Sequence, residues 1–421
     1  MRHLVAPRYP LQLSRTANRI AISGGLGLSN YRRLLATIHN AVSKLDYDDL
    51  HLDFRGCESA FPGPMLALCA DVGRLRRDGR QITITLPTRK RLRTLFLNSG
   101  WAHQLDPINQ DESQFKGYVQ VPVIQFSSPG EQHNAVNRMV DAVLCSQTQL
   151  SRSDLAAIEW AINEIIDNVI NHSQSVIGGF AQLSNYKSSG RVEFSVSDAG
   201  LGIPATLKEG HPELQSDTEA LDLAIREGVT RNKELGQGNG LFGTLEITHV
   251  GTGYLHVHSG YASFDQGDSQ LRTKSEQIPF KGTLVVAALD VSDTEALGAA
   301  LRFEGKRYEP LDYLETRYES SGGETIRFRL KEEVASFGSR KAGGALRTKL
   351  SNLVRMNPGV PVLVDFTDIP LVSSSFADEV FGKLFVELGA LRFMQAIRFQ
   401  GMADTVSPFV DRAILQRARD A

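Results

Sequence analysis

The sequence has little of what marks a secreted or membrane protein. Its three cysteines, Cys57, Cys69 and Cys145, lie far apart in a chain of 421 residues. This spacing excludes a disulfide framework and a CxxC metal site, and small buried core residues are the simpler interpretation. No apolar run approaches the ~20 residues that span a bilayer, and the first residues lack the apolar segment of a signal peptide. We therefore expect a soluble, cytoplasmic protein that has no contact with a membrane.

An excess of charge of one sign is also missing. The chain has 46 Lys and Arg against 48 Asp and Glu, a formal net charge of −2. Such a balance argues against a dedicated nucleic-acid binder, so we expect protein partners and no nucleic acid. The basic run Arg89, Lys90, Arg91 and Arg93 is either a local binding patch or a solvated helix face, and the neutral chain favours the second.

What the chain does have is apolar content and a regular alternation of patterns. Hydrophobic residues make up 41%, enough for buried cores, and the length suits two to four domains of roughly 100–200 residues each. Residues 1–115 and 324–421 alternate strand and helix patterns, which predicts α/β layers. Residues 116–291 group strands after long helix patterns, and the charged segment 292–323 reads as a linker. We expect an α/β multidomain chain with a central α+β two-layer sandwich.

The two flanking regions share a weak repeat. The stretch HLDFRGCESAFPGPMLAL lines up with LVDFTDIPLVSSSFADEV, so that Asp53 and Phe54 fall on Asp365 and Phe366. The match indicates either two related flanking domains or the general pattern of strand, loop and helix that α/β proteins share.

The central region carries a carboxylate and a carboxamide on one predicted helix, within DLAAIEWAINEIIDNVINHS. Glu164 and Asn168 are four residues apart and therefore share a face. The Asn oxygen suits Mg²⁺, which keeps waters and bridges phosphates, and the Glu can accept a proton from an attacking hydroxyl or water. Taken alone, the pair is equally what a solvated helix face presents.

Two glycine motifs follow along the chain. A strand pattern runs into Asp198-Ala199-Gly200-Leu201-Gly202, where the carboxylate can accept from an adenine amino group and the glycines allow a flat ligand close to the backbone. Gly236-Gln237-Gly238-Asn239-Gly240 then precedes a predicted helix, where free N–H groups and the helix dipole suit phosphates. Alone, the first is also a plain turn and the second a flexible loop; neither is a Walker A loop or a dinucleotide fingerprint.

Together, in this order, the three motifs resemble the N, G1 and G2 boxes of the GHKL ATPases, the histidine-kinase-like superfamily that includes DNA gyrase, Hsp90 and MutL. The stretch NEIIDNVINHS is similar to the N box of bacterial anti-sigma-factor serine kinases. The resemblance implies ATP and Mg²⁺ as cofactors, Glu164 as general base, Asn168 as magnesium ligand and Asp198 as adenine acceptor. It also implies nucleotide contacts from Gly200, Gly202, Gly236, Gly238, Gly240 and Thr283.

The resemblance makes about 203–235 the ATP lid. Thr230, Arg231 and Lys233 would then either approach the phosphates or lie in a solvated loop. His172 lies either near the nucleotide or packed against the loop.

The flanks resemble STAS-like domains, residues 324–421 more closely and the first 115 residues in a more diverged form. In anti-sigma pathways a GHKL kinase phosphorylates a STAS serine at a helix start. Ser373, Ser374 and Ser375 occupy that place here, with Ser374 as the candidate acceptor, unless the serine simply caps the helix. Phe61, Pro62 and Gly63 stand there in the first copy, which has no acceptor. The fusion of both parts in one chain departs from the separate-protein arrangement of that family.

Three functions stay open at this point. The first is an ATP-dependent regulator that switches protein partners and transfers phosphate to a serine. The second is an ATP-hydrolysing clamp that works as a homodimer, and the third is a nucleotide-binding scaffold without turnover. No histidine lies in an H-E-x-R-T-P-like setting, which argues against a two-component histidine kinase.

Overall fold

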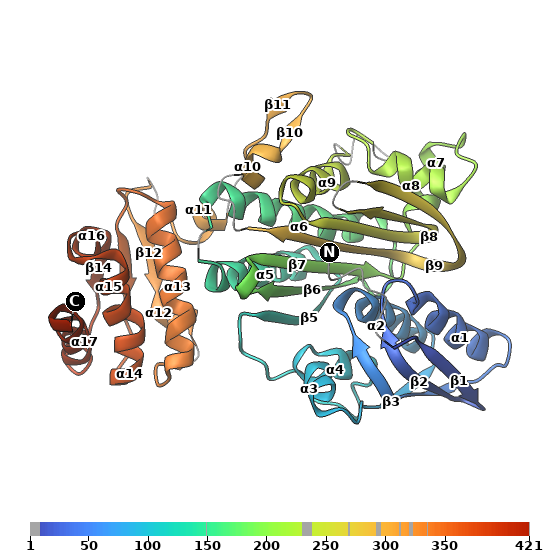
Figure 1. Cartoon of the computed structure of the whole chain (residues 1–421), viewed down its shortest axis with the longest axis horizontal. Coiled ribbons are helices and arrows are strands. Elements are labelled where there is room, and N and C mark those ends of the chain that lie inside the picture. Colours follow the sequence, from blue (N-terminus) through green and yellow to red (C-terminus); the bar gives the residue numbers. More distant parts are fainter. Residues whose placement is uncertain are drawn as a thin grey trace.

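The computed structural model describes residues 9–148, 150–229, 238–267, 270–291, 296–310, 313–319, 323–334 and 336–420. Besides a two-stranded hairpin, the described residues form three larger sheets that follow one another along the chain, each with its own helices (Figure 1). We call them the N-terminal unit (β1 to α4), the central unit (β5 to β9) and the C-terminal unit (β12 to α17). The N-terminal unit lies against one face of the central sheet and the C-terminal unit at its end. The expected α/β class is confirmed.

The N-terminal unit has a four-stranded sheet of order β1-β2-β3-β4, in which β2, β3 and β4 are parallel. Its elements are β1 (Gln12–Thr16), β2 (Arg19–Leu26), α1 (Tyr31–Ser43), β3 (Asp49–Ala60), α2 (Pro62–Arg77), β4 (Gln81–Thr85), α3 (Lys90–Asn98) and α4 (Trp101–Leu105).

The central unit has an antiparallel sheet of order β5-β6-β7-β9-β8. Ser151 caps the helix that carries Glu164 and Asn168 by accepting from the Asp154 N–H. The elements are β5 (Gln120–Phe126), α5 (Pro129–Ser146), α6 (Arg152–His172), β6 (Gly179–Tyr186), β7 (Arg191–Asp198), α7 (Ile203–Gly210), α8 (Asp217–Ala224), α9 (Gly240–Val250), β8 (Tyr254–Gln266) and β9 (Leu271–Asp290).

Both faces of the central sheet are covered. Val192 and Phe194 point into a core shared with α5 and α6, whereas Leu284 and Val286 join the core of the N-terminal unit. Every residue of β7 after Arg191 is buried, as in strands that lie between two layers. The central unit itself thus has a sheet and one layer of helices, and α1 and α2 of the N-terminal unit add a layer on the other face, because the sheet is apolar on both sides.

The C-terminal unit has a parallel sheet of order β12-β13-β14. Its strands and helices succeed one another as β2, α1, β3, α2, β4 and α3 do, and Asp53 and Asp365 lie on the middle strands, in agreement with the sequence repeat. The elements are β12 (Ile326–Arg329), α12 (Leu330–Glu333), α13 (Arg340–Met356), β13 (Val362–Asp365), α14 (Ser374–Ala377), which continues into α15 (Lys383–Leu388), α16 (Ala390–Ala396), β14 (Ile397–Gln400) and α17 (Ser407–Asp420).

The segment expected as a linker, 292–323, has ordered parts. Where described, it forms α10 (Ala296–Ala300), a hairpin of β10 (Arg302–Phe303) and β11 (Lys306–Arg307), and α11 (Tyr313–Arg317). Leu297, Leu301 and Tyr313 are buried in the core that includes α6. Apolar side chains between the charged residues therefore anchor this segment.

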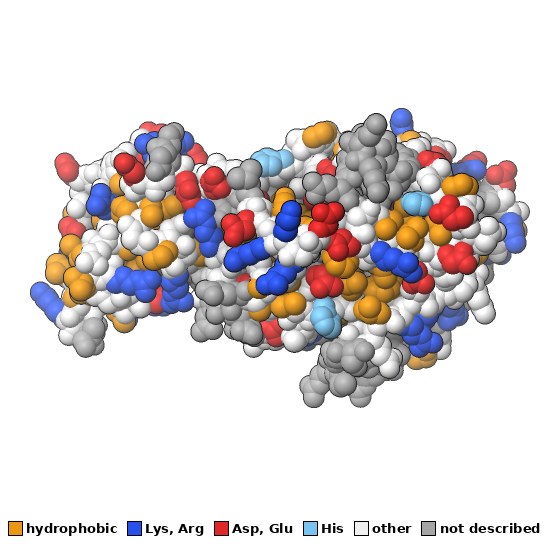
Figure 2. Space-filling model, turned by 90° about the horizontal axis from the view of Figure 1, so that it is seen from above, with side chains coloured by type: hydrophobic (Ala, Val, Ile, Leu, Met, Phe, Trp, Pro, Cys, Tyr) orange, Lys and Arg blue, Asp and Glu red, His pale blue; other side chains and the backbone are white. Residues whose placement is uncertain are grey.

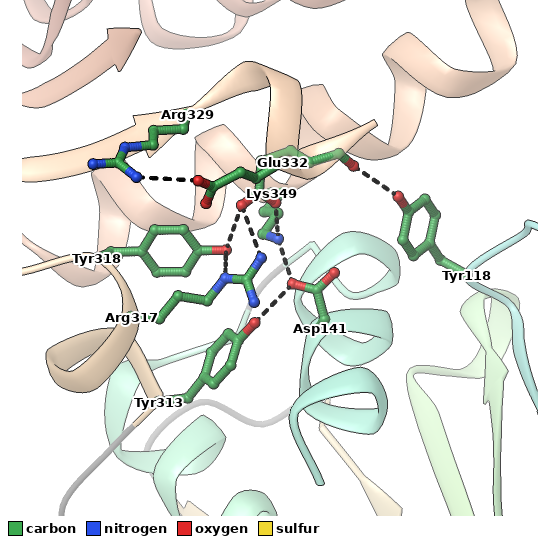
Figure 3. Close-up of polar contacts among 9 residues, drawn as sticks. Tyr118, Asp141, Tyr313, Arg317, Tyr318, Arg329, Glu332 and Lys349 are labelled. Atoms are coloured by element: carbon green, nitrogen blue, oxygen red, sulfur yellow. Dashed lines mark hydrogen bonds and ion pairs between the residues drawn. The ribbon is translucent and has the colours of Figure 1, made fainter. Parts of the chain in front are cut away.

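A buried ionic cluster fixes the C-terminal unit to α5 (Figure 3). The Lys349 ammonium, whose side chain is 1% exposed, contacts the carboxylates of Asp141 on α5 and Glu333 on α12. Burial alone would lower the pKa of Lys349, but the surrounding negative groups hold it well above its usual value. Arg317 adds a second cation at Glu333, at 3.2 Å. Removing either sign would leave buried charge uncompensated.

Across the parts of the chain that the structure describes, no helix is both long enough and apolar enough to cross a bilayer.

Candidate functional site

One pocket is lined by residues of α6, α7 and α9 together with the neighbouring strands β7 and β9 of the central sheet. It encloses about 1060 Å³ of space free of protein atoms, including solvent at its mouth. The pocket brings together most of the residues that the sequence singled out: Glu164, Asn168, His172, Asp198, Gly202, Gly238, Gly240 and Thr283.

Six predicted positions are not among these pocket residues. Gly200 lies just behind the pocket wall, where its N–H donates to Asp198 Oδ1 at 2.8 Å. Gly236 lies outside the described residues, as do the lid candidates Thr230, Arg231 and Lys233. Ser374 belongs to the C-terminal unit and is exposed, away from the pocket.

Helix α6 carries Glu164 and Asn168 on the side away from Ile162 and Ile166, which are buried in the core. The two side chains therefore point into the pocket. Burial, and secondarily the nearby Asp167 carboxylate, raises the pKa of Glu164 to about 7. A carboxyl group with that pKa can both accept and release a proton near neutral pH.

Asp198 ends β7 and is almost completely buried, at 2% exposure. Burial raises the pKa of its carboxyl group to about 7, although N–H donors of Gly200 and Thr283 partly oppose the shift. A buried acceptor of this kind prefers a ligand that donates a hydrogen bond.

The glycines after Asp198 are required by the protein's own backbone. A Cβ on Gly200 would lie 2.0 Å from the Ser173 carbonyl oxygen, and one on Gly202, which has φ +82°, would lie 2.6 Å from Ser259 Oγ. The expectation that these glycines mainly admit a flat ligand needs correction at Gly200, because the space is already filled by the end of α6.

Gly240 begins α9 directly against the α6 pair. A Cβ there would lie 2.8 Å from Glu164 Oε2 and 3.4 Å from Asn168 Nδ2. Gly238 has φ +72°, and a Cβ on it would lie 2.5 Å from the Val229 carbonyl. The N-terminus of α9 therefore stands beside Asn168, where its first-turn N–H groups suit an anionic group.

The residues fit a magnesium ion that is held mainly through a ligand. The described residues contain no group of three or more His, Cys, Asp or Glu that could hold a metal. Mg²⁺ commonly keeps several waters and binds substrate phosphates alongside one or two protein oxygens, so Asn168 is the residue that would hold it here.

Sequence reasoning missed the apolar wall of the pocket and part of its polar support. Val196 and Val285 line it from β7 and β9, and Ile165 from α6. Val196 lies two residues before Asp198 and hence on the same face of the strand, a signal that the sequence did offer. Ser259, which contacts both α7 and β9, had no such signal.

Comparison with curated proteins finds no match to the chain. Among protein families, the description "STAS-like domain of unknown function" matches residues 342–407, which run from α13 to the start of α17. The C-terminal unit therefore contains a STAS-like domain.

Proposed function

We propose that the central unit binds ATP with Mg²⁺ as a GHKL-type module, and that the chain is an ATP-dependent regulator acting on protein partners through its STAS-like part. One observation carries the proposal: the buried Asp198 carboxylate, the Glu164–Asn168 pair and the N-terminus of α9 line a single pocket. These are the positions to which the motif resemblance assigns adenine, magnesium and phosphate contacts.

The adenine end of the pocket would lie at Asp198. Its carboxylate can accept from the exocyclic amino group of adenine, while Val196 and Val285 offer apolar contact to the ring. Because the pKa of Asp198 is about 7 in the empty pocket, a donor that favours the ionised form binds more tightly as pH rises through 7.

The phosphate end would lie at α9 and Asn168. The helix N-terminus and the Asn168 carboxamide supply contacts to phosphate and to magnesium, respectively. Glu164 would take the proton of an attacking hydroxyl or water.

The STAS-like domain presents a serine that is free of the capping role. Ser373 caps α14 by accepting from the Phe376 N–H at 3.1 Å, so the helix cap is Ser373 and not the candidate acceptor Ser374. The next residue, Ser374, is exposed. An added phosphate there would meet solvent and the helix N-terminal N–H groups.

That serine lies far from the pocket of its own chain. The Ser373 N–H is bonded to Phe337, which precedes α13, whereas the other end of α13 meets the start of α6 through Arg152 and Asn357 at 2.7 Å. Asn168 is then about 24 Å further along α6, at 1.5 Å per residue. With the Lys349 cluster intact, phosphate would have to pass to a serine on another molecule.

Figure 2 shows acidic and basic side chains interspersed over one face of the molecule, across all the parts that it displays. A mixed surface of this kind suits protein partners better than a polyanion, which binds a field of positive charge.

The test uses γ-labelled ATP on full-length variants. ATP·Mg²⁺ binding should be lost in Asn168→Ala and Asp198→Asn, and undiminished binding in both would contradict the site. For transfer, Asn168→Ala protein, which keeps Ser374, is mixed with Ser374→Ala protein, which keeps the pocket. Label on the Asn168→Ala chains supports a serine kinase that acts between molecules.

Other outcomes of the same assay favour the two alternatives. Free phosphate without labelled protein favours an ATP-hydrolysing clamp, and tight binding without either product favours a scaffold.

A further inference from the structure

Arg32 of α1 reaches out of the N-terminal unit into the central sheet. Its side chain is buried, with the residue only 6% exposed. Nη1 donates to the carbonyl oxygens of Gly260 at 2.8 Å and Ile278 at 2.7 Å, and Nη2 donates to that of Ala262 at 2.8 Å. The two terminal nitrogens of this buried guanidinium are thus paired with backbone carbonyls that lie far away in the sequence, whereas Nε has no hydrogen-bond partner among the described residues.

These carbonyls lie at a break in the β8–β9 ladder. Gly260 pairs with Phe280 and Ala262 with Ser275, so residues 276–279 have no place in the register. Backbone groups at such a bulge lose their ladder partners and need others. The planar fork of an arginine can serve several carbonyls at once, which a lysine ammonium on its flexible stem does less well.

The same bulge is tied to the pocket walls. Ser259 Oγ accepts from the Ile203 N–H at 2.9 Å and donates to the Gly282 carbonyl at 2.8 Å. Ile203 begins α7 and lines the pocket. Gly282 packs so closely that a Cβ on it would lie 2.2 Å from the Asp198 carbonyl oxygen.

A third connection reaches α8. The Tyr261 N–H donates to Asp217 Oδ2 at 2.8 Å, and Asp217 also pairs with Lys208 of α7 at 2.8 Å. The position of the bulge therefore sets the position of α7, α8 and the strand that carries Thr283.

We propose that Arg32 is a positioning residue for the nucleotide pocket: it holds the β8–β9 bulge from the N-terminal unit and thereby fixes the walls formed by α7 and β9. The idea rests on the proposed nucleotide function of that pocket. It makes the N-terminal unit part of the nucleotide-binding module, so that a change in how that unit docks would alter nucleotide affinity.

The first measurement is ATP·Mg²⁺ affinity by calorimetry on the full chain, at a temperature at which circular dichroism shows each variant folded. Arg32→Ala should weaken binding at least tenfold, and Arg32→Lys should weaken it less. The matched control is Arg33→Ala, which removes the exposed neighbouring arginine and should leave affinity unchanged.

The second measurement separates positioning from a merely structural role. Hydrogen exchange on the nucleotide-free chain should show that Arg32→Ala exposes the amides of Ile203 and Tyr261, while the amide of Leu52 on β3 stays protected. Equal loss of protection at all three would overturn the proposal, because Arg32 would then only stabilise its own unit. Unchanged exchange at Ile203 and Tyr261, or unchanged affinity, would overturn it too.

Failure of the nucleotide function gives a different result. If wild-type protein does not bind ATP, the proposed function falls, whereas the exchange comparison still decides whether Arg32 holds the bulge.

Discussion

Replacing Asp198 by asparagine should stabilise the empty protein and abolish ATP binding. Burial raises the pKa of this carboxyl group from 3.8 to about 7, so at pH 8 the folded chain holds a buried charge that the unfolded chain would solvate. The pKa of Asp198 is higher in the folded chain than in the unfolded chain, so protonation of this carboxyl group favours the folded state. This contribution to the unfolding free energy is fully present below pH 4 and is lost as pH rises through 7.

The size of the effect follows from the shift. About three pKa units correspond to roughly 4 kcal/mol of cost for the ionised form at high pH. An asparagine carries no charge, but its buried NH₂ group needs an acceptor, which offsets about 1–3 kcal/mol of the gain. We expect a net gain in unfolding free energy of about 1–3 kcal/mol at pH 8 and no gain at pH 4.

The assay is urea unfolding at pH 4 and pH 8. Unfolding is monitored through hydrogen exchange of the β7 and β9 amides, because a chain of several units need not unfold in one step. Asp217→Asn is the control of opposite sign. Burial by itself would raise the pKa of Asp217, but Lys208 and the Tyr261 N–H hold it below its usual value. The folded chain therefore favours the ionised carboxylate, and this variant should lose stability at pH 8. An Asp198→Asn variant that is less stable at pH 8, or that keeps wild-type ATP affinity, would refute the reasoning.

Three further outcomes are expected. Glu164→Gln should keep ATP binding and lose turnover, and full turnover in this variant would contradict Glu164 as the base. A pH–rate profile of the wild-type protein should show turnover rising with pH through about 7. Gly240→Ala should weaken ATP·Mg²⁺ binding at least tenfold by titration calorimetry, because its Cβ would clash with Glu164. The control is Gly130→Ala, which should bind normally because its Cβ would have no atom within 4 Å. Lys349→Met should lower the unfolding free energy by about 3–5 kcal/mol because it leaves buried carboxylates unpaired, and limited proteolysis should then release the C-terminal unit. The control is Lys331→Met, at an exposed position. Equal protease resistance of both variants would count against the cluster as the anchor.

Much of the fold could be predicted from local patterns. The helix with Glu164 and Asn168 follows from apolar residues at helical spacing, and the structure has it at Arg152–His172. The strands and helices of the C-terminal region follow in the same way. Such features depend on residues within a turn or two of one another, so they can be read along the chain.

The polar residues of the candidate site could also be predicted from the sequence, because the chemical properties of a motif depend on its residue types and their spacing. Glu164, Asn168, Asp198 and Gly240 were identified separately, and the structure brings them to one pocket. Their pKa values were not accessible, because these depend on burial by distant segments. The reason for Gly200 was misjudged, because the atom that fills its space belongs to Ser173.

The sequence by itself therefore determined the elements, their order and most of the polar residues that line the candidate pocket. Only the tertiary structure decided that the N-terminal unit covers the second face of the central sheet, through contacts such as Tyr31 with His258 and Arg32 with Gly260. It also decided that Ser374 lies away from its own pocket. The physical reason is that these arrangements depend on surfaces meeting across hundreds of residues, for which no periodicity or spacing along the chain gives a signal.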